Sequence, residues 1–162
     1  MTAETGLLCT QKGKLVTVSG RIMKTIGEGI ILTIIGNVHG MHETESHSMT
    51  RIYLRQELAE GRYRVNYVSG AISDGPAPRW WGSGYLYYAW GLIPDGNPYG
   101  FGMPIFSFGE HPTAEAVEEA CRGMHRDIFI SNGGISLWYS GYDKVDDNRG
   151  SVTIRLTRIG DI

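Results

Sequence analysis

The sequence has few cysteines, little net charge and no long hydrophobic run. Its two cysteines, Cys9 and Cys121, lie in dissimilar contexts and form no C-x-x-C pair, so two free thiols are favoured over a single disulfide. The net charge of -2 and the lack of any basic run exclude the usual nucleic-acid-binding surface. The longest apolar run, at 29–38, is too short to span a bilayer.

Targeting and catalytic motifs are also missing. The N-terminal stretch MTAETGLLCTQKGK has neither a basic start nor a continuous apolar segment, so we expect a soluble protein without a cleaved leader, cytoplasmic or exported by a leaderless route. There is no G-x-S-x-G elbow, no H-E-x-x-H helix and no P-loop. Acid pairs such as Glu57 with Glu60, or Asp95 with Glu110, are not singled out by any pattern. We therefore expect a protein that is not an enzyme.

Glycine and aromatic residues, in contrast, are plentiful. The 162 residues include 23 glycines, nine tyrosines and four tryptophans, with 41% hydrophobic and 20% charged residues. Glycines scattered between aromatic and β-branched runs indicate many tight turns between short strands. The length and the balance of residues fit one globular domain over 1–162.

Strand-like runs recur along the whole chain. Alternating or β-branched segments predict strands at about 14–22, 29–38, 52–54, 63–67, 85–93, 101–109, 126–131, 134–140 and 151–159. The run GIILTIIGNV at 29–38 is expected to be a strand buried on both faces. The segment that follows, 39–48, is expected to be a polar loop.

One segment favours a helix, at 111–124. Thr113 can cap its N-terminus, acidic residues follow in its first turns, and Gly123 can end it. Because the helix occurs only once between strands, the β-α-β alternation of a parallel sheet is absent. We therefore predict an all-β fold, an antiparallel β-sandwich of jelly-roll type with one inserted helix.

The densest acidic segment, YDKVDDNRG at 142–150, precedes the last predicted strand. Asp143, Asp146, Asp147 and Asn148 fall within six positions. Such residues are favoured in solvated turns for backbone reasons, and they also supply the oxygens that Ca²⁺ prefers. Adjacent carboxylates repel one another unless solvent or a cation screens them. We therefore predict a calcium-competent loop, with the solvated turn as the alternative.

Histidines gather in a second polar segment. HGMHETESH offers His39, His42 and His47 to a metal such as zinc, yet their spacing matches no specific template. A solvated loop is favoured there.

Aromatic residues gather beside the Pro- and Gly-rich segment 73–84. Trp80 and Trp81 are adjacent, so both cannot point to one face of a strand, and at least one ring is expected to be exposed or half-exposed. Exposed rings stack on sugars or anchor protein interfaces. Core packing is expected for the alternating Tyr85 and Tyr87 and for Trp138.

Two stretches, GRYRVNYVSGAISDGPAPRWWG at 61–82 and GGISLWYSGYDKVDDNRGSVTIRL at 133–156, carry a family resemblance. Together they resemble the LecA-like (PA-I type) galactophilic bacterial lectins, a calcium-dependent family with a galactose-binding-like jelly roll. The closing DNRGSVTI matches that family's ending most closely. The resemblance extends over about 58–158, with the segment 111–124 as an insertion.

The resemblance implies one calcium ion between two loops of these stretches, 73–82 and 142–150. In the family this ion also coordinates sugar hydroxyls. By that resemblance, Asp147 and Asn148 are its paired side-chain ligands, Asp74 offers a backbone carbonyl, and Asp143 is a substitute for an earlier aspartate of the family. The remaining candidates for ligand binding are Trp80, Trp81 and Asp146.

We therefore expect a lectin-like carbohydrate-binding module, with Ca²⁺ as its cofactor and a carbohydrate as its partner. A homo-oligomer is compatible with this expectation. The alternative is a structural or adhesion protein, such as a phage or secretion-system component, that keeps the sandwich and binds protein instead of sugar.

Overall fold

The computed structural model of the protein describes residues 5–10, 14–19, 26–27, 29–43, 49–73, 80–81, 86–90, 102–106, 110–130, 134–139 and 146–162. All structural statements below concern these residues.

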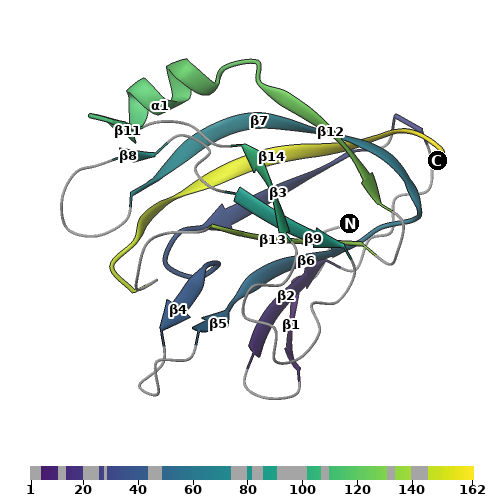
Figure 1. Ribbon diagram of the computed structural model, residues 1–162, viewed down its shortest axis with the longest axis horizontal. Helices are drawn as coiled ribbons and strands as arrows, with labels where there is room; N and C mark the ends of the chain where they lie inside the picture. The colour runs from purple at the N-terminus through teal and green to yellow at the C-terminus, as the bar shows by residue number, and fades with distance from the viewer. Residues whose placement is uncertain are drawn as a thin grey trace.

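The described strands form two six-stranded sheets and a small two-stranded one (Figure 1). The first sheet runs in the order β1 (Thr5–Thr10), β2 (Lys14–Ser19), β6 (Tyr53–Glu57), β13 (Gly134–Tyr139), β9 (Leu86–Trp90) and β10 (Gly102–Phe106). The second runs β11 (Glu110–His111), β8 (Trp80–Trp81), β7 (Gly61–Ser73), β14 (Arg149–Gly160) and β3 (Gly29–Ile35), with β12 (His125–Ile130) also on β7. The small sheet pairs β4 (Met41–Glu43) with β5 (Met49–Arg51).

The strands pair antiparallel with one exception among the described ladders. β2 runs parallel to β6, from Val16 opposite Tyr53 to Ser19 opposite Gln56. The prediction of a mostly β chain with antiparallel sheets and one short helix is confirmed, while a purely antiparallel pairing is wrong for this one ladder. Strand pairing of this kind joins residues far apart in sequence, which local alternation cannot reveal.

A hydrophobic core lies between the two large sheets, which form two layers in Figure 1. Leu54 of β6 pairs with Leu137 of β13, and both side chains are buried in the same cluster as Ile154 of β14. In β14, every second residue from Val152 to Arg158 is buried, as expected for a strand with one face on a core. The cluster draws on β3, β6, β7, β10, β12, β13, β14 and α1.

Strand β3 differs from its prediction. Its residues alternate, with Leu32 and Ile34 buried, while Ile31 and Ile35 are exposed. The expectation of a strand buried on both faces is therefore wrong. β3 lies at the end of its sheet and only one of its faces meets the core. Core packing therefore explains only some of its apolar residues.

The single described helix, α1 (Ala114–Cys121), confirms the predicted cap and is shorter than the predicted segment. The Thr113 hydroxyl accepts a hydrogen bond from the Ala116 N–H at 3.1 Å. Gly123 follows the helix with a φ of 78°, the left-handed backbone typical of a helix end. Val117 and Cys121 are the buried residues of the helix, and Cys121 forms no disulfide within the described chain, in line with its prediction; the Cys9 side chain lies outside the described part.

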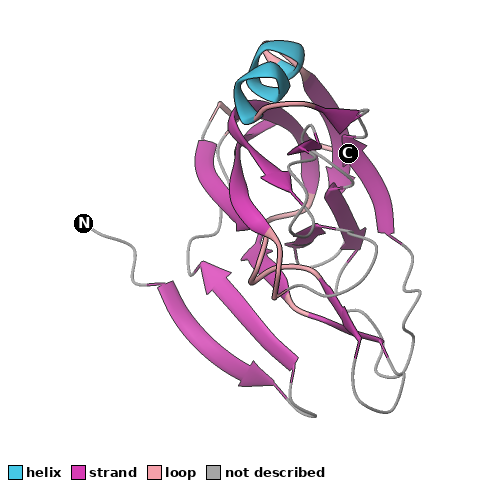
Figure 2. Cartoon of the chain, turned by 90° about the vertical axis from the view of Figure 1, so that its left-hand side faces the viewer, coloured by secondary structure: helices cyan, strands magenta, loops and turns pink. Residues whose placement is uncertain are grey.

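The helix lies against strand β7 (Figure 1), at the top of the view in Figure 2. On that edge, β12 pairs with 61–66 and β8 with 72–73, which leaves the middle of β7 without a strand neighbour. There the Tyr67 N–H donates to the Met124 carbonyl at 2.9 Å, and the Gly70 N–H donates to Glu118 Oε1 at 2.8 Å. The segment β11–α1–β12 therefore completes the edge of the sheet.

The same part of β7 contains a β-bulge. The register with β14 shifts between Thr153 and Ile154, so that Val68 is the extra residue. Gly70 has a φ of 92°, and a Cβ there would collide with the Ser151 carbonyl oxygen. This position therefore requires glycine for both its backbone angle and its close approach to β14.

Candidate functional site

Four segments meet at one end of the second sheet. Ser73 at the end of β7 pairs with Trp80 of β8 on one side and with Arg149 of β14 on the other. The Gly36 N–H, just after β3, donates to the Gly150 carbonyl at 2.9 Å. The ends of the predicted loops at 73–82 and 142–150 are therefore neighbours, joined through the last residue of β7. We call this group of segments the sheet end.

Asn148 is buried at the sheet end and is only half satisfied. Its Nδ2 donates to the Gly36 carbonyl at 2.9 Å, and its side-chain oxygen Oδ1 has no hydrogen-bond partner among the described residues. The Gly36 carbonyl can only accept a hydrogen bond, so the Asn148 amide must turn its Nδ2 toward it and its Oδ1 away from it. A buried oxygen without a partner costs about 1–3 kcal/mol relative to a satisfied one. An unused acceptor of this kind can bind a cation or a hydrogen-bond donor of a ligand.

Asp146 and Asp147 precede Asn148 in a turn and are both exposed. Both residues are therefore exposed to solvent and adjoin the buried Asn148 in sequence, and carboxylate and amide oxygens are both ligand types that Ca²⁺ accepts. Asp74 and Asp143, the other two predicted metal ligands, lie outside the described residues.

Trp80 is half-buried and packs against the hydrophobic core. A Cβ built on Gly150, whose φ is 80°, would lie 3.1 Å from Trp80 Cζ3 and would collide with the Ala71 carbonyl oxygen. One edge of the indole therefore lies close to Gly150 at the start of β14, two residues along the chain from Asn148. The prediction of at least one exposed or half-exposed tryptophan is met by Trp80, while the side chain of Trp81 is not described.

Within the described part of the chain, no three His, Cys, Asp or Glu side chains cluster in a way that could hold a metal ion. Asparagine and backbone oxygens fall outside that set of side chains, and they are among the ligands that Ca²⁺ accepts.

His39 belongs to the turn behind the sheet end and was predicted to lie in a solvated loop. That expectation is wrong for this residue, because His39 is buried and its Nδ1 accepts a hydrogen bond from the Ile35 N–H at 3.0 Å. Burial lowers the pKa of His39 from 6.5 to about 4, so the imidazole is neutral near pH 7. The side chain of His42 and the whole of His47 lie outside the description.

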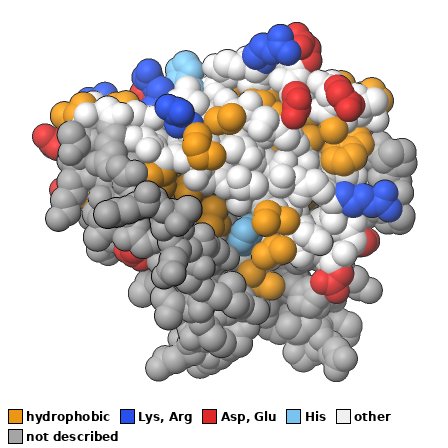
Figure 3. Space-filling view, turned by 180° about the vertical axis from the view of Figure 1, so that it is seen from behind, with side chains coloured by type: hydrophobic (Ala, Val, Ile, Leu, Met, Phe, Trp, Pro, Cys, Tyr) orange, Lys and Arg blue, Asp and Glu red, His pale blue; other side chains and the backbone are white. Residues whose placement is uncertain are grey.

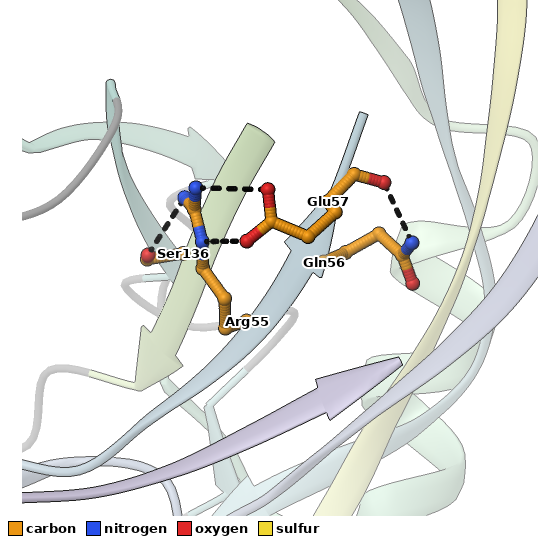
Figure 4. A network of polar contacts seen from close by, with 4 residues as sticks. All are labelled: Arg55, Gln56, Glu57 and Ser136. Atoms are coloured by element: carbon orange, nitrogen blue, oxygen red, sulfur yellow. Dashed lines mark hydrogen bonds and ion pairs between the residues drawn. The ribbon is translucent and has the colours of Figure 1, made fainter. Parts of the chain in front are cut away.

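A second polar group lies on the first sheet (Figure 4). Arg55 and Ser136 are register partners on the face opposite the core pair Leu54 and Leu137, and both are buried. The guanidinium Nε donates to Glu57 Oε1 at 3.0 Å and Nη1 donates to the Ser136 hydroxyl at 3.5 Å. The Glu57 carboxylate therefore neutralises the buried Arg55 guanidinium, and removing either partner would leave an unpaired charge at this position.

Sequence reasoning missed the roles of Gly36 and His39. Gly36 stood at a predicted strand end, and nothing local signals that its carbonyl receives the Asn148 amide. The sequence offers His39 either as a residue of a solvated loop or as a metal ligand, whereas in the structure its imidazole accepts a hydrogen bond from the end of β3.

No family model, no curated protein and no solved structure matches this chain. In the described part, none of the helices has both the length and the apolar character needed to cross a membrane.

Proposed function

We propose that the protein is a non-catalytic, lectin-like carbohydrate-binding module whose ligand binds at the sheet end. The observation that carries this proposal is the buried Oδ1 of Asn148, which has no partner among the described residues and directly follows the exposed Asp146 and Asp147 in sequence. A sugar is a ligand of many hydroxyls, and a site that combines an unused buried acceptor, carboxylates and an aromatic ring suits such a ligand.

Ca²⁺ is proposed as the cofactor of this site. Asn148 Oδ1 would give the ion a neutral oxygen and Asp147 a charged one, and an ion there would relieve both the unsatisfied amide and the repulsion of the adjacent carboxylates. Asp74 and Asp143 remain proposed ligands from outside the described residues. The ion would supply positions for hydroxyl oxygens of the sugar, while the chain orders the loop through the Asn148 bond to Gly36.

Trp80 is proposed to form the apolar side of the sugar site. Its ring is half-buried over Gly150, so one part of the indole is held by the core and another remains available for stacking. Asp146 and Trp81 are proposed as further ligand contacts. The jelly-roll topology and the likeness to galactophilic lectins belong to the same proposal, supported by the pairing of Ser73 with both Trp80 and Arg149 at one end of a sheet.

The alternative is a structural or adhesion protein that binds another protein. The observation in its favour is the set of exposed apolar side chains on the strands, which includes Ile31, Val68 and Phe129. Figure 3 shows hydrophobic side chains in several groups on the face seen from behind. A glycan array that stays blank with and without Ca²⁺ would favour this alternative.

Calorimetric titration of the chelated protein with Ca²⁺ tests the metal site. We expect heat of binding and a rise in melting temperature for the natural protein, and loss of both for Asp147→Asn. Glu115→Gln is the matched control, because it removes one exposed carboxylate from helix α1, far from β14 in sequence. Equal responses from the two variants, or no response in the natural protein at millimolar Ca²⁺, would refute the calcium site.

The sugar site is tested separately with the same glycan array in Ca²⁺ and in chelator. Binding that survives in chelator would separate the sugar site from the metal. Binding that is lost in Trp80→Ala, with a melting temperature close to that of the natural protein, would support the stacking role.

A further inference from the structure

The outer edge of β3 has hydrogen-bonding groups that no described residue uses. β3 is the last strand in its sheet and pairs with β14 from Gly29 to Ile35 without a register shift. Neighbouring residues of a strand direct their N–H and C=O groups to opposite sides. Since the Gly36 N–H points to Gly150 of β14, the odd-numbered residues of β3 point to the outer edge.

One end of this edge is closed by the protein itself. The Ile35 N–H donates to His39 Nδ1 at 3.0 Å, and the Ile35 carbonyl accepts from the N–H groups of Val38 and His39 at 3.0 and 2.8 Å. The outward-pointing groups of Gly29, Ile31 and Thr33 have no comparable bond within the described chain. The open part of the edge is therefore centred on Ile31.

The open edge lacks the features that usually keep strand edges apart. β3, with the sequence GIILTII, has no charge, no proline and no bulge, and Ile31 is 51% exposed. The opposite edge of the same sheet has charged residues in β12, a two-residue strand β11 and the helix α1 in between. One edge is thus protected and the other is suited to pairing.

We infer that β3 pairs antiparallel with β3 of a second copy of this chain, about a two-fold axis at Ile31. In this register Ile31 faces Ile31 of the partner subunit, and Gly29 of each chain faces Thr33 of the other. All three open residues then exchange bonds, roughly six in total. An uncharged strand is self-compatible, because a two-fold axis would otherwise place like charges opposite each other.

The register follows from the His39 contact. A pairing centred on Thr33 would place Ile31 opposite Ile35, whose N–H and C=O groups are already bonded in the turn. A pairing centred on Leu32 leaves Gly29 opposite the same closed residue. Centring on Ile31 is the arrangement in which every open group has an open counterpart.

The mass of the full chain in solution, measured by sedimentation and light scattering over a range of concentrations, tests the inference. We expect a dimer for the natural protein and loss of the dimer for Ile31→Lys, which places two ammonium groups together at the axis. Ile35→Lys is the matched control, with the same substitution on the same exposed face of β3, and it is expected to keep the dimer. Melting curves of both variants show whether each is folded.

Oxidative cross-linking in a Cys9→Ser background tests the register independently of stability. Ile31→Cys is expected to give a covalent dimer, and Ile35→Cys none, because the two copies of residue 35 would lie about 27 Å apart. A monomer at every concentration, equal loss of the dimer in both lysine variants, or cross-linking through residue 35 alone would overturn the inference.

Discussion

At the scale of single residues, two glycines with similar backbone angles separate the effect of conformation from that of space. Gly70 and Gly123 have φ values of 92° and 78°, and a Cβ at Gly123 would meet no heavy atom within 4 Å. A Cβ at Gly70 would collide with the backbone of β14 at the bulge.

We therefore predict that Gly70→Ala lowers the free energy of unfolding by about 3 kcal/mol or more, through a clash that neither strand can relieve. Gly123→Ala should cost about 1 kcal/mol, the penalty of the left-handed backbone alone. Denaturant unfolding of the two variants measures the difference, and equal losses would contradict the close approach at the bulge.

His39, in the turn that follows β3, makes the stability of the protein depend on pH. Its pKa is about 4 in the folded protein because of burial, against 6.5 for an ordinary histidine. As the pH falls, His39 therefore becomes protonated at a higher pH in the unfolded chain than in the folded protein. The contribution of neutral His39 to stability is complete above pH 6.5 and is lost progressively down to pH 4, by up to about 3 kcal/mol.

We predict that His39→Asn, which keeps an acceptor for the Ile35 N–H, has a flatter stability profile between pH 6.5 and 4 than the natural protein. His125→Asn is the control, because His125 is exposed on β12. Unfolding free energies measured across this range decide the point, and parallel profiles for natural protein and His39→Asn would contradict it.

At the scale of elements, α1 acts as a substitute for a strand along the middle of β7. The Glu118 carboxylate accepts the Gly70 N–H at 2.8 Å, a bond that a neighbouring strand would otherwise provide. Tyr67, whose pKa is raised by burial, donates its hydroxyl to the Gly70 carbonyl at 2.5 Å. The bulge, the helix and the glycine therefore form one unit.

We predict that Glu118→Ala lowers the free energy of unfolding by about 1 kcal/mol and speeds hydrogen exchange of the Gly70 amide. Glu119→Ala, one position along the same helix, should cost less than about 0.5 kcal/mol. Its ion pair with Arg122 has side chains that are 70% and 75% exposed. Unchanged exchange at Gly70 in Glu118→Ala would show that the carboxylate is not its partner in solution.

At the scale of the whole molecule, the proposed sugar site and the proposed dimer edge are adjoining but separate features. β3 runs from the open edge at Ile31 to the turn at Gly36, whose carbonyl holds Asn148. An antiparallel pair of β3 strands would therefore direct the two sheet ends away from each other. A dimer of this kind would present two sites to a surface with repeated sugars, and such bivalence raises avidity without any new contact at either site.

The sequence by itself determined the features that depend on near neighbours. Alternating and β-branched runs located most of the described strands, and in β7 and β14 the alternation arises because one face of the strand meets the core and the other is more exposed. Thr113 and Gly123 marked the ends of the helix, since a cap is a bond between residues three positions apart. The acidic segment before β14 was visible for the same local reason, as was the pair of tryptophans.

Only the tertiary structure decided which elements meet. The parallel pairing of β2 with β6, the burial of His39 and the bond from Asn148 to Gly36 join positions that no local pattern relates. The strand at 29–38 shows why, since an apolar run is equally compatible with a central strand and with an edge. Its place at the end of the sheet follows from its pairing with β14 alone among the described strands of the large sheets, while β7 pairs with the other side of β14, and such pairing is a property of long-range packing.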